Sequence, residues 1–186
     1  MKKLLFLVAL ATLGISKSTY AQDVKFGVKT GLNLANITGA SDVDTNNLIG
    51  FHIGAISEIS VSDKFSVQPE LLYTRQGSEI GNAFKIKLDY LAIPVMAKYY
   101  VMPKLSLELG PQVSFLVSDK IEFEGAGIPD AETDAASTDF GLNVGAGYKL
   151  DSGIFMQARY NFGISTISEN PDLKNSVLKL SLGYQF

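Results

Sequence analysis

The sequence predicts an all-β fold, an eight-stranded antiparallel up-and-down transmembrane β-barrel. Three observations support this prediction: apolar residues alternate with small or polar ones in eight segments, short connections alternate with long ones, and the apolar positions are uncharged. Successive residues of a strand point to opposite faces, so each segment has one apolar face. Because a water-exposed face is normally about a quarter to a third charged, we expect the apolar face to contact lipid.

The first 21 residues are expected to be a cleaved signal peptide, which leaves residues 22–186 as the barrel domain. Lys2 and Lys3 precede an uncharged, mostly apolar run over residues 4–15, and Thr19-Tyr20-Ala21 supplies small residues for cleavage before Gln22. A retained membrane anchor is the alternative, but a spanning helix needs about 20 apolar residues. Removing three of the 16 basic residues leaves 13 against 19 acidic ones, and this net charge of −6 argues against nucleic acid as a partner.

The first four strands are expected at residues 24–34, 49–61, 65–75 and 89–99. Each is assigned because its apolar residues recur at every second position, which is the period of a strand with one apolar face. The apolar faces run from Val24 to Leu34, from Ile49 to Val61, from Phe65 to Tyr73 and from Leu91 to Tyr99.

The last four strands are expected at residues 105–117, 139–149, 154–164 and 178–186. Their apolar faces run from Leu105 to Val117, from Phe140 to Tyr148, from Ile154 to Ile164 and from Leu178 to Phe186. A tilted strand needs about 9–11 residues to cross a bilayer, so all eight are long enough to span one.

The connections alternate in length along the chain. Tight turns are expected at residues 62–64, 101–104 and 150–153, and longer polar loops at 37–48, 77–85, 119–137 and 167–175. Outer-membrane barrels have short periplasmic turns and longer extracellular loops. Both ends of the mature chain are therefore expected on the periplasmic side.

Aromatic residues on the apolar faces are expected to form two belts. Phe26, Phe65, Tyr99, Tyr148, Tyr184 and Phe186 are near the short-turn end, and Phe51, Tyr73, Phe115, Phe140, Tyr160 and Phe162 are toward the long-loop end. Aromatic side chains gather at both interfaces of a bilayer. A secreted β-sandwich or lipocalin-like barrel also alternates, but its polar face is rich in charge, whereas Gly, Ser, Asn and Gln dominate here.

An eight-stranded barrel is just wide enough for its inward side chains to fill. Ten charged residues have the inward parity: Lys25, Lys29, Glu58, Glu70, Lys98, Glu108, Asp139, Lys149, Arg159 and Lys179. Buried charges must be paired and hydrogen-bonded, so we expect a charge network that plugs the lumen. Its candidate members are Glu58, Glu70, Lys98, Glu108, Arg159 and Lys179, and the alternative is a narrow channel for small solutes.

No enzymatic role, cofactor, metal or catalytic residue is predicted. His52 is the one histidine, and Ser57 and Glu58 of its own strand are too far along the strand to act with it, although partners from other strands stay open. The acidic 119–137 loop matches no calcium-binding template. The chain has no cysteine, so neither a disulfide nor a thiolate metal site can form.

The chain ends on an alternating strand with Tyr184 and Phe186 on its apolar face. Because a barrel in lipid must leave no open edge, this strand is expected to pair with the first one. We expect the two aromatics to serve also as the assembly signal that the barrel-assembly machinery recognises.

The stretches PELLYTRQG (69–77), YLAIPVMAKYY (90–100) and LGPQVSFLVS (109–118) resemble the PorT-like outer-membrane β-barrel family of Gram-negative bacteria. GLNVGAGY (141–148) and ARYNFGI (158–164) fit its later strands, so the resemblance covers the mature chain. It implies a small barrel in the cell outer membrane, in contact with outer-membrane lipid. The expected role is structural or in surface interaction, with surface or secretion partners reached through the four long loops.

Overall fold

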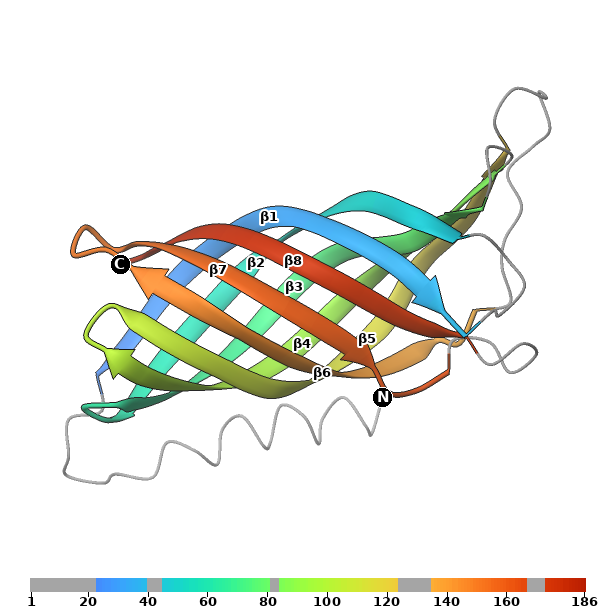
Figure 1. Ribbon diagram of the computed structural model, residues 1–186. Helices are drawn as coiled ribbons and strands as arrows, with labels where there is room; N and C mark the ends of the chain where they lie inside the picture. The colour runs from blue at the N-terminus through green and yellow to red at the C-terminus, as the bar shows by residue number, and fades with distance from the viewer. Residues whose placement is uncertain (1–22, 40–44, 81–83, 124–134, 167–172) are drawn as a thin grey trace.

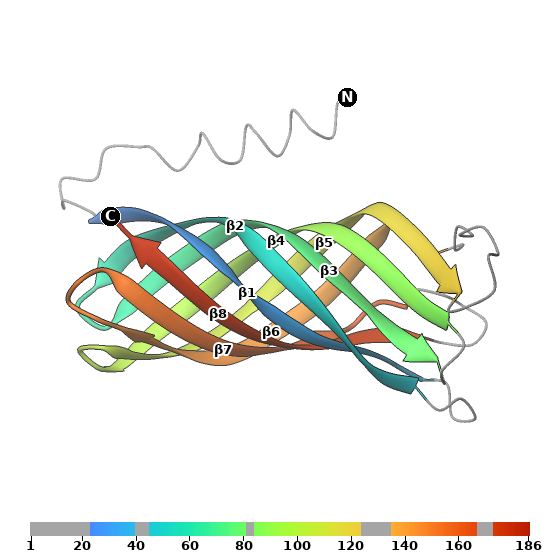
Figure 2. The ribbon, with the colours of Figure 1, turned by 90° about the horizontal axis from the view of Figure 1, so that it is seen from above.

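The computed structural model describes residues 23–39, 45–80, 84–123, 135–166 and 173–186. These residues form a closed antiparallel barrel in which each strand pairs with its sequence neighbours, as Figures 1 and 2 show. The strands are β1 (Val24–Thr38), β2 (Thr45–Ser62), β3 (Phe65–Ile80), β4 (Phe84–Met102), β5 (Leu105–Phe123), β6 (Thr138–Lys149), β7 (Ile154–Gly163) and β8 (Lys174–Gln185). The predicted fold class is confirmed, whereas the predicted signal peptide lies outside the described residues.

The last strand closes the barrel against the first. Tyr184 is opposite Val28 in the β1–β8 pairing, and the Phe186 amide donates to the Phe26 carbonyl at 3.0 Å. The predicted turns at 62–64, 101–104 and 150–153 lie at the same end of the barrel as the C-terminus (Figure 1). We call this end the turn end and the opposite one the loop end.

The barrel is inverted relative to a water-soluble protein, with apolar side chains outside and polar ones inside. On β1 and β8, Leu32 and Leu182 point outward and are 58% and 55% exposed, whereas the inward Asn33 and Lys179 are buried. An exposed apolar band that encircles a barrel is the surface that lipid covers. No helix in the described part of the chain is long and apolar enough to span a membrane.

Three strands continue beyond the apolar band at the loop end (Figure 1). We call residues 75–80 of β3, 84–89 of β4 and 118–123 of β5 the extension; its β4–β5 register shifts where it begins, between Asp89 and Tyr90. On its outward face Arg75 forms an ion pair with Asp89 at 2.7 Å, and Lys85 lies 3.5 Å from Glu79. Because a charged side chain facing hydrocarbon is costly, the extension lies outside the apolar band.

The predicted 77–85 loop is therefore wrong, since β3 runs to Ile80 and β4 begins at Phe84. The first residues of the predicted 119–137 loop and both ends of the predicted 37–48 loop also belong to strands. The physical reason is that backbone hydrogen bonding between the strands continues beyond the part of each strand whose side chains face lipid.

Candidate functional site

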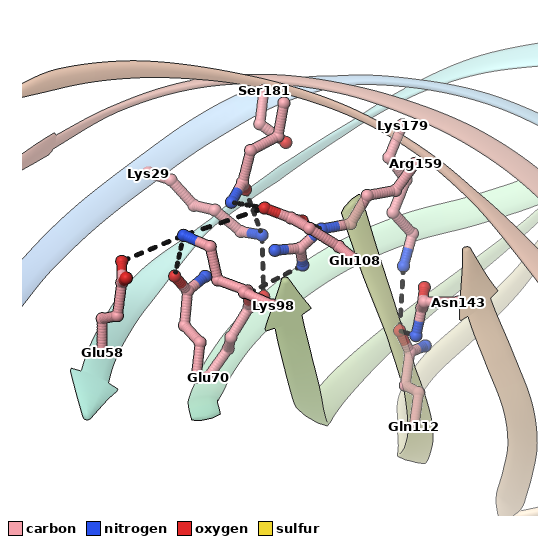
Figure 3. Close-up of polar contacts among 12 residues, drawn as sticks. Lys29, Glu58, Glu70, Lys98, Glu108, Gln112, Asn143, Arg159, Lys179 and Ser181 are labelled. Carbon is pink, nitrogen blue, oxygen red and sulfur yellow. Dashed lines mark hydrogen bonds and ion pairs between the residues drawn. The ribbon is translucent and has the colours of Figure 1, made fainter. Parts of the chain in front are cut away.

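Charged side chains from four strands meet at the centre of the barrel (Figure 3). Arg159 of β7 donates through Nε to Glu108 of β5 at 2.6 Å and through Nη1 to Glu70 of β3 at 2.7 Å. Lys29 of β1 lies with its Nζ 2.7 Å from the second oxygen of Glu70. Each of these four residues is at most 4% exposed, so their charges are compensated by one another rather than by water.

A second group of contacts lies toward the turn end. Lys98 of β4 donates to Glu58 of β2 at 2.9 Å and to Gln68 at 3.0 Å. It also lies 3.8 Å from Glu108, which joins this group to the central one. Glu58 accepts further hydrogen bonds from the Tyr100 hydroxyl and from the Gln185 amide at 2.8 Å.

A layer of amide side chains lies on the other side of Arg159, toward the loop end. Lys179 of β8 donates to Gln112 of β5 at 3.1 Å, and Asn143 of β6 donates to the same oxygen at 3.2 Å. Among the described residues Lys179 has hydrogen-bond contact with an amide rather than with a carboxylate. All six predicted network residues are thus buried in the lumen, but they lie at different heights along it.

Glycine makes room for the long side chains of this interior. Gly145 of β6 lies opposite both Glu108 and Arg159 in the strand pairing. A Cβ there would lie 2.6 Å from Arg159 Cγ and 2.4 Å from the Ala158 carbonyl oxygen, which is far inside van der Waals contact. The Arg159 stem therefore occupies the space that a larger residue at position 145 would take.

His52 of β2 contacts two polar side chains, one from the neighbouring β1 and one from β8, which is not adjacent to β2. Its Nδ1 lies 2.8 Å from Asn33 Oδ1 of β1, and its Nε2 lies 2.8 Å from Ser181 Oγ of β8. These are the residue types of a serine nucleophile with an oriented base, and sequence analysis missed Ser181 because it lies 129 positions away. His52 is fully buried and Ser181 is 7% exposed, so a substrate would have to enter the packed lumen to reach the hydroxyl.

The loop end of the lumen contains a buried apolar cluster beside buried polar residues such as Gln76 and Ser78, and this cluster was not predicted from the sequence. Ile37, Leu88 and Tyr90 form a buried cluster, against which Ile86 and Leu116 pack. The signal was present in the sequence, because on β4 the inward positions 88, 90, 92, 94 and 96 are as apolar as the outward ones. A strand that is apolar on both faces indicates contact with packed side chains on one side and lipid on the other.

A cavity of about 760 Å³ opens at the turn end, lined by the short turns and by Glu58, Tyr100 and Gln185. Lys25 and Lys149 also line it; Lys25 was expected inside the lumen but forms an exposed ion pair with Asp23 at 2.8 Å. On the rim, the hydrogen bond from Lys104 to Asp151 raises the pKa of that lysine.

The described residues contain no group of three or more His, Asp or Glu side chains placed to hold a metal ion. The acidic residues of the predicted 119–137 loop lie partly outside the described residues, so their arrangement stays untested. Tyr184 and Phe186 lie on the outward face near the turn end, 47% and 72% exposed, and their role in assembly stays a prediction.

The outer membrane protein beta-barrel domain model matches residues 20–169, whereas no curated protein matches the chain by sequence. Among solved structures, Neisserial surface protein A (NspA) has 15% sequence identity, with 89% of this chain and 100% of that chain covered and a TM-score of 0.63. Ail, the attachment invasion locus protein of Yersinia pestis, has 16% identity, with 88% and 99% covered and a TM-score of 0.59. At these identities the two likenesses show a shared fold. With the family model covering most of the chain, this protein belongs to the outer membrane protein beta-barrel domain family.

Proposed function

We propose that this outer-membrane barrel has a structural or surface-interaction role, with a lumen plugged by its own side chains and no catalytic activity. The observation that carries the proposal is the contact of Arg159 with Glu70 and Glu108, on two other strands. Barrels that leave an aqueous channel have about 16–18 strands. In a lumen of eight strands, a fully buried ion pair of this kind occupies the path that a solute would take.

The extension supports the surface-interaction part of the proposal. Its three strands continue past the lipid-facing band and carry charged side chains on the outward face, so they offer a rigid surface outside the bilayer. Binding residues are disproportionately placed on segments that a rigid scaffold holds in position. With the short turns in the periplasm, the extension lies at the cell surface.

The same proposal includes three further points: the narrower PorT-like resemblance, export by the signal peptide, and recognition of Tyr184 and Phe186 by the assembly machinery. A catalytic role of His52 is not included, because the histidine and Ser181 are both buried in the lumen.

Single-channel recording tests the plug. The purified wild-type protein in planar bilayers is expected to show no steady openings. A variant that removes the central contacts, Glu70→Ala/Glu108→Ala/Arg159→Ala, is expected to show conductance if it folds, as judged by heat-modifiable gel migration. Steady openings of the wild-type protein would show a channel and overturn the plugged-lumen proposal.

Cysteine labelling tests the orientation, and the chain is suited to it because it has no cysteine of its own. In intact cells a membrane-impermeant maleimide is expected to label Lys120→Cys in the extension. Asp63→Cys, in a short turn, is the matched control and is expected to react only after the outer membrane is permeabilised. The reverse pattern would place the extension in the periplasm.

A further inference from the structure

We propose that the cavity at the turn end binds a zwitterionic amino acid or short peptide, with the ligand's carboxylate at Lys149 and its ammonium group at Glu58. This site lies at the opposite end of the barrel from the extension, so it is separate from the surface-interaction role. The orientation of the barrel decides only from which compartment the ligand enters.

The cavity is large enough for such a ligand and is closed by side chains at its inner end. Its volume of about 760 Å³ is within the range of about 300–1,000 Å³ that small-molecule sites have. At the inner end Lys98 contacts Glu58 and joins it to the central group of charged residues (Figure 3). With the lumen plugged, the ligand binds in the cavity without passing through the barrel.

Lys149 and Glu58 line opposite walls of this cavity. Lys149 is the last residue of β6 and Glu58 belongs to β2, and these two strands are four steps apart in either direction around the barrel. With strands about 4.8 Å apart and tilted by about 40°, an eight-stranded barrel is about 16 Å across between backbones. In the part of the chain that the structure describes, the two side chains form no ion pair with each other, so the cavity separates their charges.

The Lys149 wall has hydrogen-bond donors to offer. Glu58 and Asp23 are the acidic residues whose charges act on Lys149, but Glu58 contacts Lys98 at 2.9 Å and Asp23 contacts Lys25 at 2.8 Å. Lys149 is half-buried, and none of its three donors has an acceptor among the described residues. A ligand carboxylate supplies acceptor oxygens, and hydrogen bonds between two charged groups are the strong ones.

The Glu58 wall has the reverse character, because it offers acceptors. Glu58 accepts hydrogen bonds from the Tyr100 hydroxyl and from Lys98. The amide of Gln185 donates a third, which leaves about one of the four acceptor positions of the carboxylate unused. Gln185 lines the same cavity, and within the described residues its carbonyl oxygen has no hydrogen-bond partner. An ammonium group, which donates and does not accept, fits this wall.

The charges of the rim favour a ligand that carries both signs. Two exposed ion pairs lie there, Lys25 with Asp23 at 2.8 Å and Lys104 with Asp151 at 2.6 Å. Asp63 adds a further acid to the lining, which disfavours a strongly anionic ligand. The two walls below the rim add one charge of each sign, so a zwitterion is complementary to both walls, whereas a ligand with a single charge is repelled by one of them.

The test is isothermal titration calorimetry of the full mature protein in detergent micelles with dialanine, N-acetyl-dialanine and dialanine amide. The acetyl form lacks the ammonium group and the amide lacks the carboxylate. Wild-type protein is expected to bind dialanine at least about tenfold more tightly than either blocked form, because each block removes hydrogen bonds between charged groups. Alanine is the second probe: equal affinity for alanine supports the site with free amino acids as its ligands, and weaker binding of alanine supports it with short peptides.

Variants assign the two walls. Lys149→Met is expected to abolish the preference for dialanine over dialanine amide and to retain the preference over N-acetyl-dialanine, whereas Lys149→Arg is expected to retain both. Glu58→Gln is expected to abolish the preference over N-acetyl-dialanine. Lys104→Met is the matched control, because it removes a lysine of the same cavity that is paired with Asp151, and it is expected to retain both preferences. Heat-modifiable gel migration checks that each variant folds.

Equal affinity of the wild-type protein for dialanine and its two blocked forms would overturn the proposal, as would absence of dialanine binding at millimolar concentration. An unchanged preference over dialanine amide in folded Lys149→Met would overturn it too. The comparison of the three ligands uses wild-type protein alone, so it stays decisive if a variant fails to fold. Steady channel openings of the wild-type protein would overturn the plugged lumen and leave this site standing.

Discussion

Replacing Arg159 by methionine should be among the most destabilising single changes in this barrel. The substitution retains an apolar stem of similar length and removes the guanidinium, which leaves Glu70 and Glu108 buried with one partner fewer each. A hydrogen bond to a charged group contributes about 1.5–3 kcal/mol, so the two that Arg159 donates amount to about 3–6 kcal/mol. Breaking a buried ion pair by removing one partner costs about 3–5 kcal/mol, and the two values agree.

The assay is equilibrium unfolding of the protein in lipid vesicles with a denaturant, with the free energy obtained by linear extrapolation. The decisive comparison is the combination Lys29→Met/Glu70→Gln/Glu108→Gln/Arg159→Met, which removes the four charges of the central group together. Because replacing a whole buried charge cluster is often neutral, this variant is expected to recover most of the loss. Lys104→Met is the control, since its ion pair with Asp151 lies on the exposed rim, and it should leave the unfolding curve unchanged. A loss below about 1 kcal/mol for Arg159→Met, or no recovery in the combined variant, would refute the reasoning.

Three further variants test the packed interior, the lipid-facing band and the end of β8, where the last strand closes the barrel against β1. Gly145→Val places carbon against the Arg159 stem and should lower the free energy of unfolding by about 1–3 kcal/mol, whereas the neighbouring, outward Ala146→Val should not; equal effects would contradict the packing argument. Leu180→Arg, in the middle of the band, should cost about 2–4 kcal/mol in the same vesicle assay, and a cost as large for an arginine at Thr38 would argue against the band. Deletion of Phe186 should lower the amount of barrel in the outer membrane more than it lowers the stability of the folded protein, and normal membrane levels would count against an assembly signal.

The sequence predicts the number and order of strands because the two-residue period survives wherever one face meets lipid. The period is lost in the β3 part of the extension. Around Gln76, Gly77, Ser78 and Glu79 both faces are polar, so the pattern is that of a loop although the residues pair in a ladder with β4. Backbone pairing does not require alternation, which is why the end of β3 was not predictable from side-chain patterns alone. Residues 84–89 of β4 do alternate, but with the apolar residues inward and the charged ones outward, the reverse of the lipid-facing pattern.

The charged residues of the lumen were predictable by parity, but their contacts were not. The odd or even position of a residue along a strand determines which face it occupies, but it does not determine the height of the residue along the barrel axis. Glu70, Glu108 and Arg159 come from β3, β5 and β7, which are not adjacent strands, so no cross-strand neighbour rule connects them. Their meeting follows from the register of every intervening strand pair, and Lys179, with the same parity, contacts the Gln112 layer instead.

The contact of His52 with Ser181 depends both on the strand register and on the missing side chain of the glycine between them. Gly31 of β1 is opposite His52 on one side and opposite Ser181 on the other, so β1 separates the two side chains. A Cβ at position 31 would lie 2.6 Å from His52 Cε1; because glycine has none, the imidazole passes over β1 and accepts or donates a hydrogen bond at Ser181. The glycine therefore creates a contact of two residues that are not on neighbouring strands. Together with the contact of Nδ1 with Asn33, the contact with Ser181 gives both ring nitrogens a polar partner in the buried lumen, where an unpaired polar group is costly, and this is a sufficient structural reason for a single buried histidine.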